Sequence, residues 1–283
     1  MLKKSKNKSR GRKNLIAYRH KKLLQLGKYS FKGVTMRHFF ANLVCAFIPK
    51  RTLRNKVRTL LYYPVTRDYI GFVRNYARSH NMQKCKIKIN VGWGCSNLIV
   101  ILNNECVFKF PLKNDGKELA MREKRITDAL RPISPVKIPK MEIIPYKDIA
   151  VKKYEFAYGT LFSELPPSEV AKNVHHLAGQ LAKFLYVLAK ADPQELNDLK
   201  PENATAPGFL YGWNHGDIWQ NFMVDPKTFD LTFFIDWEYA RFGSLYPCVC
   251  VANHYWTRFD CRGLAIYTMA EYAKLYYGRK NNK

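Results

Sequence analysis

The segments HGDIWQN (residues 215–221) and FFIDWE (residues 233–238) decide the fold of this chain and hold its candidate chemistry. Asp217 and Asn221 lie four residues apart in a polar loop, and Asp236 ends an apolar run that is typical of a buried strand. Two carboxylates and an amide oxygen that converge suit magnesium-assisted phosphoryl transfer, because Mg²⁺ takes oxygen ligands and bridges phosphates, while one aspartate accepts a proton. Each motif alone also has a plain structural interpretation, since Asp and Asn form turns and cap elements.

The order and spacing of the two motifs resemble the aminoglycoside phosphotransferase/choline kinase family, which has the protein-kinase-like fold. That family carries a His-Gly-Asp catalytic loop with a downstream Asn, followed by an Ile-Asp-Trp/Phe-Glu segment. The resemblance implies that Asp217 is the catalytic aspartate, that Asn221 and Asp236 bind Mg²⁺, and that His215 holds the loop by hydrogen bonds. The family Asn usually stands five residues after the Asp and here it stands four after, so Gln220 is an alternative to Asn221.

The chain before these motifs follows the order of the same family. Lys109 falls on an expected third strand, where the family places a lysine that pairs with the α- and β-phosphates. Glu123, on an expected helix over residues 116–131, resembles the glutamate that holds this lysine, and Glu118 is the alternative. Asn103-Asn104 is expected to form the hairpin turn before the third strand.

Two further segments resemble parts of the family's nucleotide site. Gly92, Gly94 and Ser96 lie between the first two expected strands, as a phosphate-covering loop does, because glycines let backbone N–H groups approach phosphate oxygens. A plain hairpin turn would have the same glycine pattern. Glu155 and Phe156 lie at the expected junction of two lobes, where family members bind adenine through backbone groups. The resemblance therefore implies Mg²⁺ and ATP as cofactors.

The order of expected elements indicates an α+β, bilobal protein-kinase-like fold with a small β-rich N-lobe and a larger helical C-lobe. Residues 1–84 are expected to be a basic, helical N-terminal extension with a disordered start. Residues 85–158 would form the nucleotide-binding N-lobe, and residues 159–283 the catalytic and acceptor-binding C-lobe. The clearest helix is expected over residues 168–190, with Ser168 as its N-cap.

The charge of the chain is concentrated at its front. The 283 residues carry a formal net charge of +26, and residues 1–80 hold 21 basic residues against one acid, Asp68. Such a front favours a polyanion as partner, which can be an anionic membrane, a charged glycan or nucleic acid. No RNA-binding or zinc-finger signature accompanies the charge, so dedicated nucleic-acid binding is not expected.

The segment beyond Pro49 predicts a basic amphipathic helix. Its apolar stripe consists of Leu53, Val57, Leu60 and Leu61. Its basic residues are Arg51, Arg54, Lys56 and Arg58. Such a helix either lies on an anionic membrane or packs on the body of the protein with a solvated basic face, and the pattern leaves both open. Residues 46–61 also resemble, more weakly, a basic Phe-Ile-Pro segment of some bacterial enzymes that build lipopolysaccharide or capsule.

Taken together, the resemblances imply a Mg-ATP-dependent kinase that phosphorylates a hydroxyl of a sugar in lipopolysaccharide or another bacterial surface glycan. A kinase for a small soluble alcohol (choline, ethanolamine or an aminoglycoside) and a non-catalytic pseudokinase or polyanion-binding module are the alternatives. The seven scattered cysteines indicate free thiols in a reducing compartment, and neither a secretory signal nor a spanning segment is expected. The expected location is cytoplasmic, peripheral on the inner face of the inner membrane.

Overall fold

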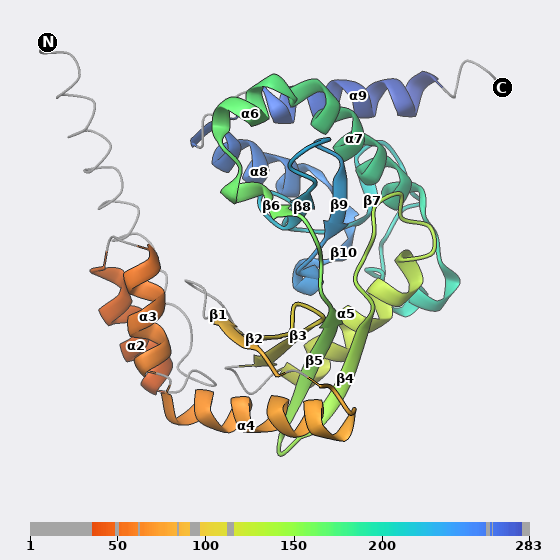
Figure 1. Ribbon diagram of the computed structural model, residues 1–283. Helices are drawn as coiled ribbons and strands as arrows, with labels where there is room; N and C mark the ends of the chain where they lie inside the picture. The colour runs from red at the N-terminus through yellow and green to blue at the C-terminus, as the bar shows by residue number, and fades with distance from the viewer. Residues whose placement is uncertain are drawn as a thin grey trace, which may run out of the picture. The chain divides into compact units, whose positions relative to one another are not determined.

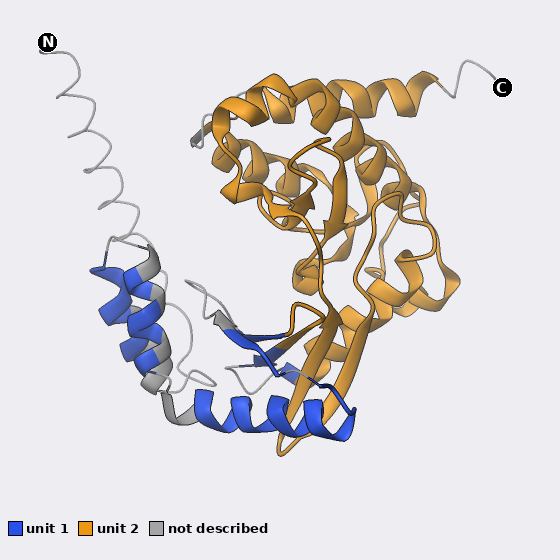
Figure 2. Cartoon of the chain, in the orientation of Figure 1, with its two compact units in different colours: residues 1–102, 109–116 blue, residues 103–108, 117–283 orange. Residues whose placement is uncertain are grey.

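The computed structural model describes residues 36–48, 51–61, 63–83, 85–90, 97–111, 116–258, 261 and 263–278 (Figure 1). The expected phosphate-covering loop with Gly92, Gly94 and Ser96 lies outside these residues. The chain forms two compact units (Figure 2). Unit 1 comprises residues 1–102 and 109–116, and unit 2 comprises residues 103–108 and 117–283. This division by compactness does not test the functional boundaries predicted at residues 84 and 158, which stay predictions.

The described residues of unit 1 form three helices followed by strands. Its elements are α2 (Met36–Ala46), α3 (Arg51–Leu61), α4 (Tyr63–Ser79), β1 (Ile87–Asn90) and β2 (Asn97–Leu102). The predicted division of the front segment near Pro49 is confirmed, because α2 ends before it and α3 begins after it. β1 pairs antiparallel with β2, and Ile87 lies opposite Leu102. Val73 of α4 and the alternating residues Leu98, Val100 and Leu102 of β2 are fully buried and form the core of this unit.

The amphipathic helix α3 does not expose its basic face to solvent in the way that one of the two sequence-based alternatives described. Arg58 is 2% exposed, and the Nη1 group of Arg54 donates a hydrogen bond to the backbone oxygen of Ile48 at 3.2 Å. Leu53 and Leu60 of the apolar stripe are instead exposed. The alternative with a solvated basic face therefore does not hold for these two arginines, because their long side chains are used in local packing.

The turn between β2 and β3 (Cys106–Pro111) has the predicted form. Asn103 and Asn104 have φ values of 55° and 57°, the left-handed conformation that a two-residue type I′ turn requires at both positions. Asn tolerates this conformation because its short side chain hydrogen-bonds locally. Together with β4 (Met141–Tyr146) and β5 (Ile149–Glu155), these strands form one sheet in the order β1-β2-β3-β5-β4, and β3 contributes residues to both units.

Unit 2 holds the rest of the sheet and all later elements. Its first elements are the helix α5 (Gly116–Leu130) and the strands β4 and β5, which pair antiparallel with each other. The helices that follow are α6 (Pro167–Lys172), α7 (Val174–Lys190), α8 (Tyr246–Arg258) and α9 (Leu264–Gly278), with 3₁₀ turns η1 (Phe162–Glu164), η2 (Gln194–Leu199) and η3 (Trp237–Tyr239). The short strands are β6 (Thr160–Leu161), β7 (Tyr211–Asn214), β8 (Phe222–Val224), β9 (Leu231–Phe234) and β10 (Arg241–Ser244).

The helix predicted over residues 168–190 is interrupted, and its predicted N-cap is wrong. α6 begins at Pro167 with Pro166 as its N-cap residue, so Ser168 lies inside the helix. Proline is favoured at the first helical position because its φ is already helical and its missing N–H needs no partner there. α6 and α7 are separated at Asn173, whose side-chain amide donates to the backbone oxygen of Glu169 at 2.9 Å and competes with the helical bonds.

The core of unit 2 is built around α7. Nine of its residues are buried, and it packs against α9, β7 and β9. Phe184 of α7 stacks on Phe234 of β9 with ring centroids 3.6 Å apart. Trp213, Trp237 and Trp256 are among the largest fully buried side chains. Within the described ranges, none of the helices combines the length and apolarity that crossing a bilayer requires.

Candidate active site

The β8–β9 hairpin brings Asn221 and Asp236 to one end. Phe222 at the start of β8 pairs with Phe234 at the end of β9. The N–H of Ile235 donates to the backbone oxygen of Asn221 at 2.9 Å and extends the pairing by one step. In an antiparallel hairpin the start of the first strand and the end of the second lie together. Residues fifteen positions apart in the sequence therefore become neighbours.

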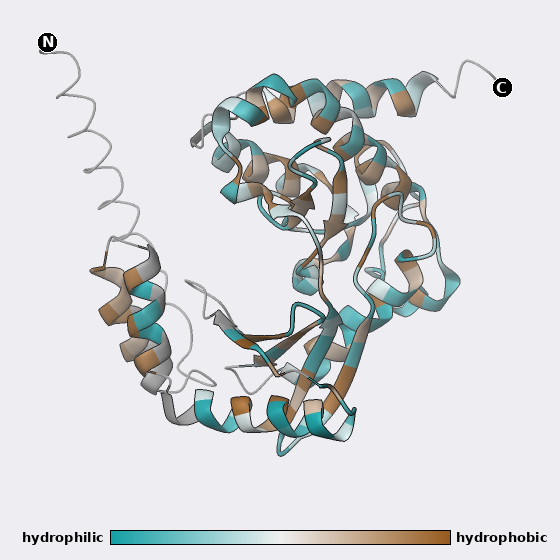
Figure 3. Cartoon of the chain, in the orientation of Figure 1, coloured by the Kyte–Doolittle hydropathy of each residue, from teal (hydrophilic) through white to brown (hydrophobic). Residues whose placement is uncertain are grey.

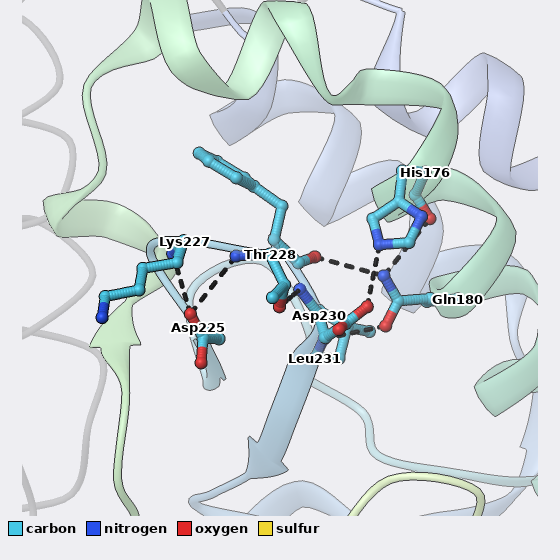
Figure 4. A network of polar contacts seen from close by, with 8 residues as sticks. His176, Gln180, Asp225, Lys227, Thr228, Asp230 and Leu231 are labelled. Atoms are coloured by element: carbon cyan, nitrogen blue, oxygen red, sulfur yellow. Dashed lines mark hydrogen bonds and ion pairs between the residues drawn. The ribbon is translucent and has the colours of Figure 1, made fainter.

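The turn at the opposite end of this hairpin is fixed to α7 (Figure 4). Gln180 donates from Nε2 to the backbone oxygen of Phe229 at 3.1 Å and accepts from the N–H of Leu231 at 2.8 Å. His176 contacts the carboxylate of Asp230 at 2.8 Å. Because the turn is held by a long core helix, the end that carries Asn221 and Asp236 has a defined position.

Asn221 contacts the predicted catalytic aspartate directly. Its Nδ2 donates to the backbone oxygen of Asp217 at 2.9 Å and to the carboxylate Oδ2 at 3.0 Å. Asn221 is buried, and the shortened loop still brings it onto Asp217, whereas no such contact is described for Gln220. Since the amide nitrogen is used for Asp217, the amide oxygen is the atom that a cation would take.

His215 connects the loop to the hairpin. It is fully buried, and its Nε2 lies 2.9 Å from the backbone oxygen of Ile235. Its Nδ1 accepts the N–H of Asp217 at 3.3 Å. These two partners fix the tautomer, because Nδ1 must be the acceptor and Nε2 the donor. The expected role of His215 as a residue that holds the loop is confirmed by these bonds.

Gly216 permits the close approach of the loop to the segment after Asp236. Its φ is 80°, and a Cβ added there would lie 2.2 Å from the backbone oxygen of Tyr239. Backbone atoms cannot give way as a flexible side chain can, so this position requires glycine for both its conformation and its contact.

Gly216→Ala is expected to lower the free energy of unfolding by about 2–5 kcal/mol, from left-handed strain and overpacking together. Gly179→Ala is the matched control: Gly179 lies in α7, an added Cβ there meets nothing within 4 Å, and alanine favours a helix by about 1 kcal/mol. Urea denaturation measures both variants. Equal stabilities of the Gly216→Ala variant and the unchanged protein would contradict the close approach.

Asp236 has a strained backbone. Its φ and ψ are 69° and 62°, the left-handed region, and it immediately precedes η3. A non-glycine residue in this region is uncommon and marks a position where the surroundings impose the conformation, as at functional sites. Trp237 fixes the segment, because it is buried and its Nε1–H donates to the backbone oxygen of Phe234 at 3.0 Å.

Asp217 and Asp236 repel each other. The pKa of Asp217 is raised to about 6, first by burial and then by the negative charge of Asp236, while the hydrogen bond from Asn221 opposes the rise. A cation between the carboxylates would relieve this repulsion. Among the described residues, no group of three or more His, Cys, Asp and Glu side chains is placed to hold a metal. Two carboxylates and an amide oxygen fit Mg²⁺, which uses few protein ligands and completes its shell with phosphate and water.

Glu123 belongs to a buried polar network. Its carboxylate contacts the Nζ of Lys152 at 2.8 Å and the hydroxyl of Tyr154 at 2.7 Å, both from β5. The pKa of Tyr154 is raised well above its usual value, mainly by burial and by Glu123, with smaller contributions from Asp236 and Glu238. The negative charge of Asp236 therefore acts on this network.

The expected nucleotide residues are placed as follows. Lys109 is buried on β3 in unit 1, and Glu123 lies in unit 2, so their predicted pairing stays a prediction. Glu118, the alternative, is exposed in the first turn of α5. The N–H groups of Glu155 and Phe156 donate to the backbone oxygens of Lys140 and Glu105 at 3.3 Å and 2.9 Å. Adenine recognition at Glu155 and Phe156 would use carbonyl oxygens or replace these bonds.

Lys152→Met is expected to destabilise the protein by about 3–5 kcal/mol, because it leaves the Glu123 carboxylate buried without its cation. Lys153→Met, at the next residue, is the control: Lys153 pairs with Glu142, whose side chain is about half exposed, and its loss costs below about 1 kcal/mol. Denaturant unfolding compares the two. Similar losses for both variants would contradict the distinct role of the buried pair.

Sequence reasoning missed several residues of the site. Lys152 lies on the same face of β5 as Tyr154, and the strand's period of two was its only sequence signal. Arg122 of α5 donates to the backbone oxygen of Ala240 at 2.8 Å and links that helix to the segment after Asp236.

Cys248 of α8 is a further residue near the loop that sequence reasoning missed. Burial raises the pKa of its thiol to about 11, and hydrogen bonds with the backbone of Ile218 and Gly216 oppose the rise. α8 therefore lies against the loop.

No protein-family model and no curated protein matches this chain. Solved structures do match its fold, among them the following three. The GDP and kanamycin complex of APH(2")-IIia is 16% identical, with a TM-score of 0.55, over 72% of this chain and 83% of that one. The GDP complex of wild-type aminoglycoside 2'-phosphotransferase-IIIa is 15% identical, with a TM-score of 0.52, over 76% and 93%. The apoenzyme of macrolide 2'-phosphotransferase MphH from Brachybacterium faecium is 14% identical, with a TM-score of 0.51, over 71% and 81%.

These likenesses establish the fold. The chain has the α+β, protein-kinase-like fold of the aminoglycoside and macrolide phosphotransferases, and the predicted fold class is confirmed. At such low identity the likeness concerns the fold alone, so chemistry must be argued from the side chains of this chain.

Proposed function

We propose that this protein is a Mg-ATP-dependent phosphotransferase, a kinase that moves the γ-phosphate of a nucleotide to a hydroxyl group. The observation that carries the proposal is the convergence of Asp217, Asn221 and Asp236 on a protein-kinase-like fold. An aspartate held by an amide, with a second carboxylate close enough to raise its pKa, supplies both a proton acceptor and cation ligands.

Asp217 is the proposed base. With a pKa of about 6 it is ionised at neutral pH and can accept the proton of the acceptor hydroxyl. The hydroxyl oxygen then bonds to the γ-phosphorus as the bond from that phosphorus to the bridging oxygen breaks, and the nucleoside diphosphate leaves. Asn221 orients the Asp217 carboxylate, and Asn221 and Asp236 would hold Mg²⁺. The ion, when bound, neutralises charge on the phosphate oxygens.

The remaining nucleotide contacts are assigned by the same proposal. Lys109 would pair with the α- and β-phosphates and be oriented by Glu123. The backbone around Glu155 and Phe156 would contact the base. A loop containing Gly92, Gly94 and Ser96 would cover the phosphates. Two of the neighbours were determined as GDP complexes, so GTP is compared with ATP as donor in the tests.

The acceptor is proposed to be a sugar hydroxyl of lipopolysaccharide or another bacterial surface glycan. α8, which lies against the loop through the bond from Trp256 Nε1–H to the backbone oxygen of Trp219 at 2.8 Å, contains no acidic residue. A polycationic acceptor would need acids there. Trp219 stacks on Tyr255 with ring centroids 4.1 Å apart, and aromatic rings of this kind suit the apolar faces of sugars.

The second candidate acceptor is a small soluble alcohol. The fold neighbours are named as phosphotransferases for aminoglycosides and macrolides, which makes such antibiotics the natural competitors in an assay. We further propose a cytoplasmic location, with residues 1–80 holding the enzyme to the anionic inner face of the inner membrane. Attraction of this kind contributes about 1 kcal/mol per Lys or Arg near the surface.

Two experiments test this function in sequence. Thermal unfolding with and without Mg²⁺, ATP and GTP should show stabilisation only when nucleotide and Mg²⁺ are both present. Mass spectrometry of the surface glycan should then show a phosphate-sized loss when the gene is deleted, restored by the unchanged gene and not by Asp217→Asn. Absence of Mg-dependent nucleotide binding would contradict the proposed kinase activity. If deletion of the gene left the glycan unchanged and the protein phosphorylated kanamycin, only the proposed acceptor would be wrong.

A further inference from the structure

The helices α2 and α3 of unit 1 present apolar side chains to solvent. Phe47, directly after α2, is 75% exposed and Leu60 of α3 is 71% exposed. The other exposed apolar residues of these helices are Phe40, Val44, Leu53 and Leu61. Phe40 and Val44 lie four residues apart on one face of α2, and Phe47 continues the same helical spacing directly after it. Figure 3 shows hydrophobic residues in both helices, with hydrophilic residues among those of α3.

The polar side of α3 is used within the unit. α2 and α3 contact each other, and the Sγ of Cys45 in α2 lies 3.7 Å from the backbone oxygen of Arg54. Arg54 itself donates to Ile48, and Arg58 is buried. An amphipathic helix that buries an arginine and exposes its leucines is suited to an apolar environment on its outer side, because exposed apolar area in water is unfavourable.

The surroundings of these apolar residues are cationic. α2 and α3 contain no acidic residue, and the exposed side chains of Lys56, Arg67, Arg74 and Arg78 lie on α3 and α4 of the same unit. An apolar face beside positive charge matches an anionic lipid surface, where apolar side chains enter the interface and cations meet phosphate groups. Nucleic acid would use the charge but not the exposed phenylalanine and leucine. At 11 residues each, α2 and α3 are too short to cross a bilayer, which needs about 20.

We propose that α2 and α3 form a membrane-docking surface that inserts Phe47 and Leu60, with their apolar neighbours, into the interface of an anionic bilayer. The inference deepens the proposed attachment of residues 1–80 and rests on that part of the proposed function. It does not depend on phosphotransfer, so either can fail alone.

Sedimentation of the full chain with vesicles tests the proposal. Vesicles of phosphatidylcholine with about one third phosphatidylglycerol should bind the protein, and pure phosphatidylcholine should bind it at least about tenfold more weakly. The double variant Phe47→Ser/Leu60→Ser should lower binding to the anionic vesicles by about tenfold or more. Ile266→Ser, at a residue of α9 that is 70% exposed in unit 2, is the matched control and should bind as the unchanged protein does.

A second readout places the side chain in the lipid. Phe47→Trp should gain fluorescence quenching by brominated lipid on anionic vesicles, whereas Ile266→Trp should not. Unchanged vesicle binding by the double variant, equal quenching of both tryptophans, or a dimer that the double variant disrupts while no vesicle is bound would each overturn the proposal. Mg-dependent nucleotide binding, measured on the same samples, shows separately whether the phosphotransferase proposal stands.

Discussion

Asp236→Asn is expected to remove Mg²⁺-dependent nucleotide binding and to lower phosphotransfer by about 10³-fold or more, since several kcal/mol of charge stabilisation depend on the ion. The amide keeps one neutral oxygen but not the negative charge that attracts the cation. Asparagine is a better probe than alanine, because the backbone at this position is left-handed and Asn tolerates that conformation. Loss of function in this variant therefore reports the charge and not a misfolded segment.

Asp225→Asn is the matched control for this result. Asp225 lies on the same hairpin but in its turn, where its Oδ1 accepts the N–H groups of Lys227 and Thr228 (Figure 4). An amide oxygen can accept the same bonds, so this variant should keep nucleotide binding and activity. Thermal shift with Mg²⁺ and ATP, and a phosphotransfer assay, measure both variants. Full Mg-dependent binding by Asp236→Asn would show that Asp236 is not a metal ligand.

Asp217→Asn is expected to lower phosphotransfer by about 10²–10⁴-fold while leaving Mg-dependent nucleotide binding in place, because it removes the proton acceptor. The introduced amide still has an oxygen that can accept the hydrogen bond from Asn221. A loss of rate with retained binding separates this variant from Asp236→Asn. If both variants lost binding equally, the division of the two aspartates into base and ligand would be wrong.

The same variant should make the nucleotide-free protein more stable at neutral pH. The folded-state pKa of Asp217 is raised to about 6, so its ionisation in the fold is unfavourable. The penalty is absent below the ordinary pKa of Asp near 3.8, grows as the pH rises towards 6, and is fully present above it. The melting temperature of Asp217→Asn should therefore exceed that of the unchanged protein at about pH 7.5, and the difference should shrink towards pH 4. Asp148→Asn, at an exposed turn residue, should show no such trend.

Local patterns predicted the parts of the fold that local physics controls. Asn103-Asn104 was expected to form a turn, and both residues have the left-handed φ that the turn requires. A helix was expected over residues 116–131, and the buried residues of α5, which are Ala120, Glu123, Ile126, Thr127 and Leu130, lie on one face. The fold class followed from the order of such elements and from two short motifs.

The features that the sequence did not predict depend on contacts between distant segments. Nothing near Lys152 in the sequence indicates that it meets Glu123, because the contact arises only when α5 packs on β5. The charge of Arg58 placed it on a basic face that would meet either solvent or an anionic membrane, yet tertiary packing buries it. Ser168 was chosen as N-cap by residue type, whereas the rigid ring of Pro167 determines where the helix begins.

The left-handed backbone at Asp236 also limits how this position can change. Only Asn and Gly share with Asp a ready tolerance of that conformation. Substitution by either of them would remove the proposed activity and keep the fold. A branched or bulky residue would impair both activity and folding, so few substitutions at this position leave a folded but inactive protein.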